Sequence, residues 1–181
     1  MLSLIILLLL AWHFYLGYSR GIILQGYYFL ATIISLIIST LYYKPLAKAI
    51  TLWVPYSNPS EDVNILFFKD VAVFDLDKVY YAGVAFLSIF IASYLVFRLL
   101  GIFVNLIDLD SFDTLTYNCV GGALSVLITM LFFNMALSIL ATIPVSFIQN
   151  ILSKEIMTKL LITFFPSAFL IKMLWVTNIL K

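Results

Sequence analysis

The sequence predicts an all-α integral membrane protein, with about four transmembrane helices followed by interfacial or re-entrant amphipathic helices in the C-terminal part. Hydrophobic residues make up 64% of the 181 residues and charged residues only 10%, whereas a typical soluble domain carries about 25% charged residues. The mean hydropathy is +1.13. A soluble fold of this length could not cover so much apolar surface with polar side chains. We therefore expect the lipid bilayer to be the main partner of this chain.

The first two helices are expected at about residues 2–18 and 22–43. The first contains no charged side chain and lacks the basic start and small-residue cleavage site of a secretory signal, so we keep it as part of the mature protein. The interruption Gly-Tyr-Ser-Arg-Gly at 17–21 is so short that the two helices must form an antiparallel hairpin. The second helix is expected to end at Lys44 and Pro45, because lysine reaches the headgroups and proline breaks a helix.

The third helix is expected at about 79–98, after a polar connection formed by residues 44–78. Within this connection, residues 44–54 are predicted to form a short interfacial helix with a tryptophan anchor. Asp75 and Asp77 come just before the third helix, where acidic side chains suit the positive end of the helix dipole.

The fourth helix is expected at about 116–143. Residues 114–153 carry no charge, and a single helix of that length would measure about 60 Å, twice the thickness of the bilayer core. Pro144 is therefore expected to end the span. For residues 145–181 we favour interfacial or re-entrant helices over a fifth span across 160–180, because this part is amphipathic rather than solidly apolar.

Arg98 is a charged residue with apolar sequence on both sides. Together with Gly101, Asn105 and Asp108 it follows a spacing of three, four and three residues, which places all four on one narrow face of a helix. An ionisable residue at membrane depth is a functional candidate. Arg98, Asn105 and Asp108 therefore form our candidate functional stripe, with Asp108 or Asp110 as the partner of the arginine. The structural alternative is that Arg98 ends the third helix at the interface.

Small residues recur at intervals of four and predict close helix packing, because packing rather than hydrophobicity drives helix association in lipid. We interpret them as contacts within one bundle rather than as a dimer face. The intervals are Gly17–Gly21, Ala31–Ser35–Ser39 and Gly121–Ser125.

Arg20 lies in the turn between the first two helices. It either sets the topology or donates to exposed helix-end carbonyls.

The sequence predicts no enzyme, no cofactor and no metal site. A single cysteine and a single histidine exclude a disulfide framework and a Cys/His metal cluster. Cys119 has no base nearby in sequence, and His13 is interpreted as an interface residue. Asp108, Asp110 and Asp113 lack the glycine and the final glutamate of a calcium loop. The net charge of +1 gives no basic surface for nucleic acid.

Four groups of residues, taken in order, carry a family resemblance that spans nearly the whole chain. They are Gly-Tyr-Ser-Arg-Gly at 17–21, Tyr-Tyr-Lys-Pro-Leu-Ala at 42–47, Asn118 followed by Gly121-Gly122-Ala123, and Ser153 before Lys154-Glu155 with Pro166 thirteen residues after Ser153. In this order and spacing they resemble the colicin V production protein family (CvpA).

The resemblance implies a single domain over residues 1–181, in the bacterial cytoplasmic (inner) membrane, with about four helices and an association with bacteriocin production. Members of the family often carry an acid near the start of the first helix. Ser3 stands closest to that position here, so no role that depends on the acid is carried over. The other motif positions are expected to have structural rather than catalytic roles: Gly17, Arg20, Gly21, Asn118, Gly121, Gly122, Ser153 and Pro166.

The orientation in the membrane stays open. With the N-terminus outside, the inner side would carry only Arg20 and Arg98, so the positive-inside rule favours cytoplasmic termini. Members of the family that are fused through their C-terminus to extracytoplasmic proteases imply the opposite.

For the function, we predict an accessory or scaffold protein that supports toxin production or an envelope process by binding partners. These partners are either further copies of the chain or other membrane and envelope proteins. The alternative is a homo-oligomeric channel or transporter subunit, whose pathway would be lined by the stripe of Arg98, Asn105 and Asp108.

Overall fold

The computed structural model describes residues 1–56, 65–69, 71–104 and 114–180, and within these ranges all regular structure is helical. The predicted all-α fold class is thus confirmed. The long helices are α1 (Leu2–Ile50), α2 (Leu76–Val104) and α3 (Leu115–Ala141). The shorter elements are η1 (Val73–Asp75), α4 (Ser146–Lys154), α5 (Ile156–Lys159), η3 (Leu160–Phe164), α6 (Pro166–Ile171), η4 (Lys172–Thr177) and α7 (Asn178–Leu180).

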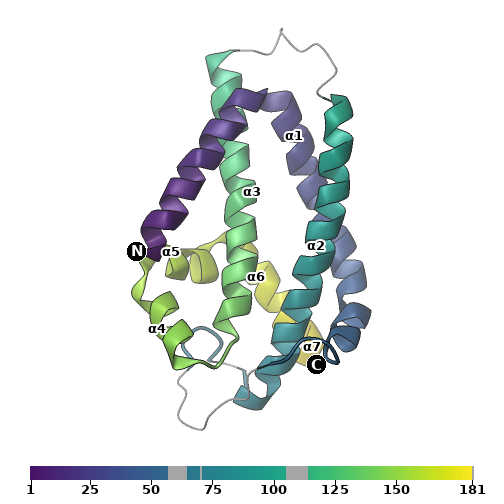
Figure 1. The fold of residues 1–181 in the computed structure, drawn as a ribbon, viewed down its shortest axis with the longest axis vertical. Helices are drawn as coiled ribbons and strands as arrows, with labels where there is room; N and C mark the ends of the chain where they lie inside the picture. Colours follow the sequence, from purple (N-terminus) through teal and green to yellow (C-terminus); the bar gives the residue numbers. More distant parts are fainter. Residues whose placement is uncertain (57–64, 70, 105–113, 181) are drawn as a thin grey trace.

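Helix α1 consists of two arms that meet at Gly21. This glycine has φ 76° and ψ 168°, a combination that is essentially restricted to glycine. Figure 1 shows the first arm rising from the N-terminus to an apex and the second arm descending beside α2. The predicted reversal of the chain is therefore present, but it takes one residue rather than a loop.

The second arm of α1 does not end where the sequence predicts. Pro45 lies inside the helix, so the prediction that it breaks the helix and starts a separate interfacial helix is wrong. Tyr43 and Ala47, on either side of the proline, are both buried. The Tyr43 hydroxyl donates to the carbonyl of Leu174 over 2.8 Å. These tertiary contacts hold the helical path although proline removes one backbone hydrogen bond.

Helix α2 continues six residues beyond Arg98, so the alternative that this arginine ends the helix is wrong. Helix α3 begins at a proper N-cap, because the Thr114 side chain accepts a hydrogen bond from the backbone N–H of Tyr117. It ends at Ala141, and the chain then turns at Pro144 before α4 starts. The predicted break at Pro144 is therefore confirmed.

Three helices, α1, α2 and the unbroken α3, are long and apolar enough to cross a membrane. The segments Ile156–Phe164 and Pro166–Thr177 supply a fourth candidate, but they meet at an angle of 56°. Such a pair is a broken span or a re-entrant loop, because a proline at the junction interrupts the helical hydrogen bonds.

The core at the end of the bundle opposite the apex is filled by the C-terminal segment. Trp175 is fully buried and packs against Phe86 of α2, with 5.9 Å between the ring centroids. A methyl group on Gly83 would lie 2.8 Å from the Trp175 ring and 2.9 Å from Ile139 of α3. Trp175 thus fills the space between α2 and α3 at this end.

Candidate functional site

The first arm of α1 crosses α3 at a contact made by glycines. A methyl group on Gly17 would lie 2.6 Å from the carbonyl oxygen of Gly121 and 3.0 Å from the Cα of Gly122. A methyl group on Gly121 would in turn lie 2.9 Å from the carbonyl oxygen of Gly17. The two backbones therefore touch, and no larger side chain fits between them.

Close to this crossing, two arginines from different helices flank one aromatic ring. The guanidinium carbon of Arg20, beside the apex of α1, lies 5.7 Å from the centre of the Tyr28 ring. That of Arg98, from α2, lies 5.8 Å from the same centre. Both distances are within the range of a cation–π contact. No sequence pattern links the two arginines, and the structure brings both to the same ring.

The two arginines line an open cavity of about 550 Å³, to which α1, α2 and α3 all contribute side chains. Its polar lining comes from all three helices, whereas its remaining walls are aliphatic and aromatic. Gln25 is 2% exposed, and its Oε1 has no hydrogen-bond partner among the described residues. The polar lining residues are His13, Arg20, Gln25, Tyr94, Arg98, Ser125 and Thr129.

Sequence reasoning found only part of this lining. It missed Gln25, the carboxamide within an uncharged stretch of 23 residues. Such a residue indicates a polar contact inside the bundle, because buried polar groups in lipid need partners. Asn105 and Asp108 of the predicted stripe lie outside the described residues, as do the proposed arginine partners Asp108 and Asp110. Arg98 is therefore the one member of the stripe that the structure places.

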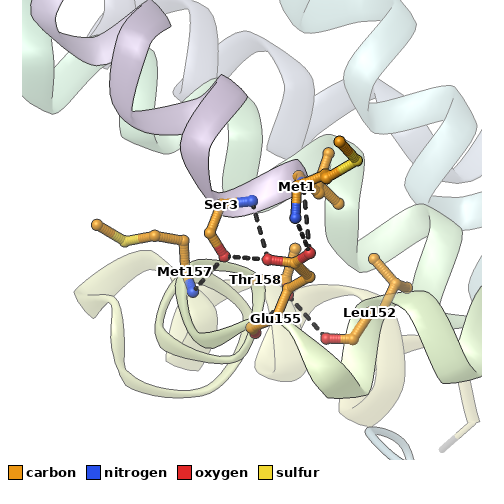
Figure 2. Close-up of polar contacts among 7 residues, drawn as sticks. Met1, Ser3, Leu152, Glu155, Met157 and Thr158 are labelled. Carbon is orange, nitrogen blue, oxygen red and sulfur yellow. Dashed lines mark hydrogen bonds and ion pairs between the residues drawn. The ribbon is translucent and has the colours of Figure 1, made fainter.

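A second polar cluster joins the start of α1 to the start of α5 (Figure 2). The Glu155 carboxylate accepts from the terminal amine of Met1 over 2.5 Å, from the backbone N–H of Leu2 over 3.2 Å and from that of Ser3 over 3.1 Å. The Ser3 hydroxyl also donates to this carboxylate and accepts from the backbone N–H of Met157. Glu155 thus caps α1, while Ser3 caps α5 in return.

The hydrogen bonds from the terminal amine and from Ser3 lower the pKa of Glu155 from 4.5 to about 2. A carboxylate that accepts several N–H bonds is stabilised in its charged form. This side chain therefore stays ionised at every ordinary pH, and it holds the C-terminal segment to the first helix.

The sequence pattern of the family described as "Colicin V production protein" matches residues 2–166. The chain belongs to this family. A relative in Bacillus subtilis (strain 168), described as "Uncharacterized transmembrane protein YshB", is 28% identical over 166 residues, which are 92% of each chain. No solved structure matches the chain.

The colicin V production family motif in the first turn lies at the apex described above. Gly17 and Gly121 form the crossing, and a methyl group on Gly122 would lie 2.7 Å from the Phe14 ring. Gly21 makes the turn, and the nearest atom to a methyl group there would be the Asn118 side-chain oxygen at 3.8 Å. Five motif positions, Gly17, Gly21, Asn118, Gly121 and Gly122, thus gather where α1 meets α3.

The remaining motif positions lie in the C-terminal segment. Ser153, near the end of α4, donates to the carbonyl of Asn150 over 3.2 Å. Pro166 begins α6 at the 56° bend. Neither residue lines the arginine cavity.

Buried amides tie α3 to the C-terminal segment, and sequence reasoning missed them. The Asn134 side chain donates to the carbonyl of Leu161 and accepts from the Ser167 hydroxyl over 2.8 Å. Gln149 donates to the carbonyls of Ala141 and Ile143 over 2.9 and 3.0 Å. Each amide bonds to backbone carbonyls that have no partner within a helix, because a helix ends or a proline interrupts it nearby. These residues therefore stabilise the fold.

Proposed function

We propose that this protein is an accessory protein of the bacterial cytoplasmic membrane that supports bacteriocin production or another envelope process by binding a partner. In this proposal it has no catalytic chemistry of its own. The observation that supports it is the cavity between α2 and α3, where Arg20, Arg98 and the buried carboxamide of Gln25 meet.

The two arginines of the cavity differ from several polar side chains elsewhere in the bundle, which tie neighbouring segments together. Asn134, Gln149 and Tyr43 all bond to backbone carbonyls of neighbouring segments. The two ion pairs among the described residues, Met1–Glu155 and Lys78–Asp75, lie elsewhere. Arg20 and Arg98 therefore carry positive charge into the cavity, and charge kept within a membrane-spanning segment is costly unless it serves a function.

The chemistry of these side chains suits recognition. A guanidinium stays protonated at all ordinary pH values and offers five N–H donors in a planar fork. It therefore binds and orients an anionic or acceptor-rich group, but it does not act as a general base. The hydroxyl of Thr129 in the same lining already donates to the carbonyl of Ser125 over 2.8 Å.

Site-specific photo-cross-linking in native membranes tests the proposal. A benzoylphenylalanine at Leu95, which lines the cavity and is 51% exposed, is expected to give one discrete protein adduct. Arg98→Gln in the same chain should weaken this adduct. A benzoylphenylalanine at Leu8, which is 63% exposed on the first arm of α1, is the matched control for general proximity in the membrane.

Two outcomes would contradict the proposal: no protein adduct at Leu95, or the same adducts at Leu95 and Leu8. The mass of the adduct tells a second copy of the chain from another envelope protein.

The channel alternative stays a prediction, because Asn105 and Asp108 of its lining lie outside the described residues. Ion flux through liposomes containing the purified protein tests it, with Arg98→Ala as the comparison. Flux that Arg98→Ala alters would support a pathway, and the absence of flux in both samples would remove the idea.

A further inference from the structure

We propose that the cavity between α2 and α3 is a binding site for an anionic phospholipid with a hydroxylated headgroup, of the phosphatidylglycerol type. In this proposal the phosphate lies between Arg20 and Arg98, and an acyl chain follows the apolar walls. The inference goes beyond the proposed function, because it names a lipid that the cavity would hold whether or not a partner protein binds at its rim.

The first argument is charge. Both guanidinium carbons lie less than 6 Å from the centre of the Tyr28 ring, so they are no more than about 12 Å apart, and both line the same cavity. Guanidinium groups bind phosphate oxygens through paired, charge-assisted hydrogen bonds. Among the described residues no acid forms an ion pair with either arginine, so the cavity has the sign and the donors for a phosphate diester.

The cationic and apolar residues of the lining lie at different depths along the cavity. The apex of α1, the end of α2 and the start of α3 lie at the same end of the molecule, at the top of Figure 1. Arg20 lies beside that apex, and Arg98 lies six residues before the end of α2. Leu87, which also lines the cavity, lies about 16 Å deeper along α2 at 1.5 Å per residue.

The cavity therefore changes from cationic to apolar over a depth of about 16 Å, close to half of a bilayer core of about 30 Å. This gradient is that of one lipid leaflet. Phe133 and Ala136 of α3 continue the apolar wall opposite Leu87 and Ile91. An amphiphile with its headgroup beside the arginines matches both the cationic and the apolar end of the lining, whereas a free phosphate ion would leave the apolar end without a ligand.

The buried carboxamide of Gln25 would select among phospholipid headgroups. Its Oε1 is buried and has no partner among the described residues, and an acceptor left unpaired in a low-dielectric site is costly. A ligand that supplies both an anion and a nearby hydroxyl donor satisfies the arginines and the carboxamide together. A glycerol headgroup has such hydroxyls, and a choline headgroup has none.

Native mass spectrometry of the full chain in detergent tests the proposal with three probes: dioctanoyl phosphatidylglycerol, dioctanoyl phosphatidylcholine and inorganic phosphate. We expect one saturable phosphatidylglycerol site and phosphatidylcholine binding weaker by about tenfold. Arg20→Gln/Arg98→Gln should weaken phosphatidylglycerol binding by at least about tenfold. The matched control, Lys48→Gln/Lys159→Gln, removes two positive charges at exposed positions outside the cavity and should leave binding unchanged.

A second variant keeps the test decisive if the double arginine variant is not monodisperse. Gln25→Leu removes no charge and puts an apolar side chain of similar size in a buried position. It is expected to weaken phosphatidylglycerol binding by about fivefold, which corresponds to one hydrogen bond.

Three results would overturn the lipid proposal. They are equal binding of the two lipids, equal loss in the lysine control, and displacement of the lipid by millimolar inorganic phosphate, which would assign the site to a free anion. The proposed function is tested separately by the Leu95 cross-link in native membranes. A protein adduct without lipid binding would reject the lipid proposal and keep the accessory role. Lipid binding without a protein adduct would reject the accessory role and keep the lipid proposal.

Discussion

The glycine crossing between α1 and α3 predicts opposite effects for the same substitution at two positions of α1. In Gly17→Ala, the added methyl group would lie 2.6 Å from a backbone oxygen and 3.0 Å from a backbone carbon of α3. In Gly26→Ala, the methyl group would meet no atom within 4 Å. Both substitutions make the same change in backbone freedom, so they differ in packing alone.

The magnitudes follow from these distances. Alanine in place of glycine within a helix stabilises it by about 0.5–1 kcal/mol. At Gly26 this gain should appear in full. At Gly17 the contacts are with backbone atoms, so two helices must move apart, and overpacking of this kind costs typically about 1–3 kcal/mol or more. We expect Gly17→Ala to be less stable than Gly26→Ala by about 2–3 kcal/mol.

Thermal unfolding in detergent, followed by tryptophan fluorescence, measures the difference. For a chain of this length, 1 kcal/mol shifts Tm by about 2–4 °C, so the two variants should differ by roughly 4–12 °C. Gly26→Ala should unfold at or above the temperature of the wild type. Equal Tm values for the two variants would show that α1 and α3 do not cross at Gly17, and would contradict the arrangement of the cavity beside the crossing.

Two further predictions concern the polar ties of the C-terminal segment. Because the pKa of Glu155 is lowered to about 2, its contribution to stability is fully present above pH 4.5 and is lost as the pH falls towards 2. The Tm of the wild type should therefore fall more over this range than the Tm of Glu155→Gln. Parallel curves of Tm against pH would contradict the capping role. Asn134→Leu should lower the free energy of unfolding by about 2–4 kcal/mol, because it leaves the Leu161 carbonyl and the Ser167 hydroxyl buried without their partner. Adding Ser167→Ala to that variant should recover part of the loss in the same thermal assay, and a further loss would be the opposite result.

Local sequence signals predicted the features that depend on a few neighbouring residues. The turn at Gly21 and the end of α3 near Pro144 follow from backbone rules for glycine and proline. The spacing of Gly17, Gly121 and Ser125 indicated close helix packing, and the structure places these residues together at one crossing. Each of these predictions needs only the conformational limits of a single residue or a helical repeat.

Features that depend on distant contacts were out of reach. The rule that proline breaks a helix failed at Pro45 because Tyr43 is held by the carbonyl of Leu174, more than a hundred residues away. The structure also places Arg20 and Arg98, seventy-eight residues apart in the chain, against the same Tyr28 ring, and no local sequence signal indicated this. Sequence patterns indicate partners that are close in the chain. In a helical bundle, however, residues far apart in the chain come into contact when they lie at the same depth in the membrane.

The start of α1 is a second place where a residue distant in sequence supplies the contact. The resemblance to the colicin V production family leads one to expect an acid near the start of the first helix, and Ser3 stands closest to that position. In the structure the carboxylate at that helix start comes from Glu155, which bonds to the backbone N–H groups of Leu2 and Ser3. The exposed N–H groups of a helix start need an acceptor, and here it comes from the residue that precedes α5.

The two ends of the bundle explain why the cavity lies where it does. Away from the apex, Trp175 of the C-terminal segment fills the space between α2 and α3, against Gly83 and Ile139. Near the apex, the same two helices are bridged by α1, and the described residues leave about 550 Å³ between them. In our proposal this open cavity beside two arginines receives a ligand, whereas Trp175 fills the corresponding space at the other end. A lipid with an anionic headgroup suits both the arginines and the apolar walls of this cavity, and this is why we place the function of the molecule at the apex end of α2 and α3.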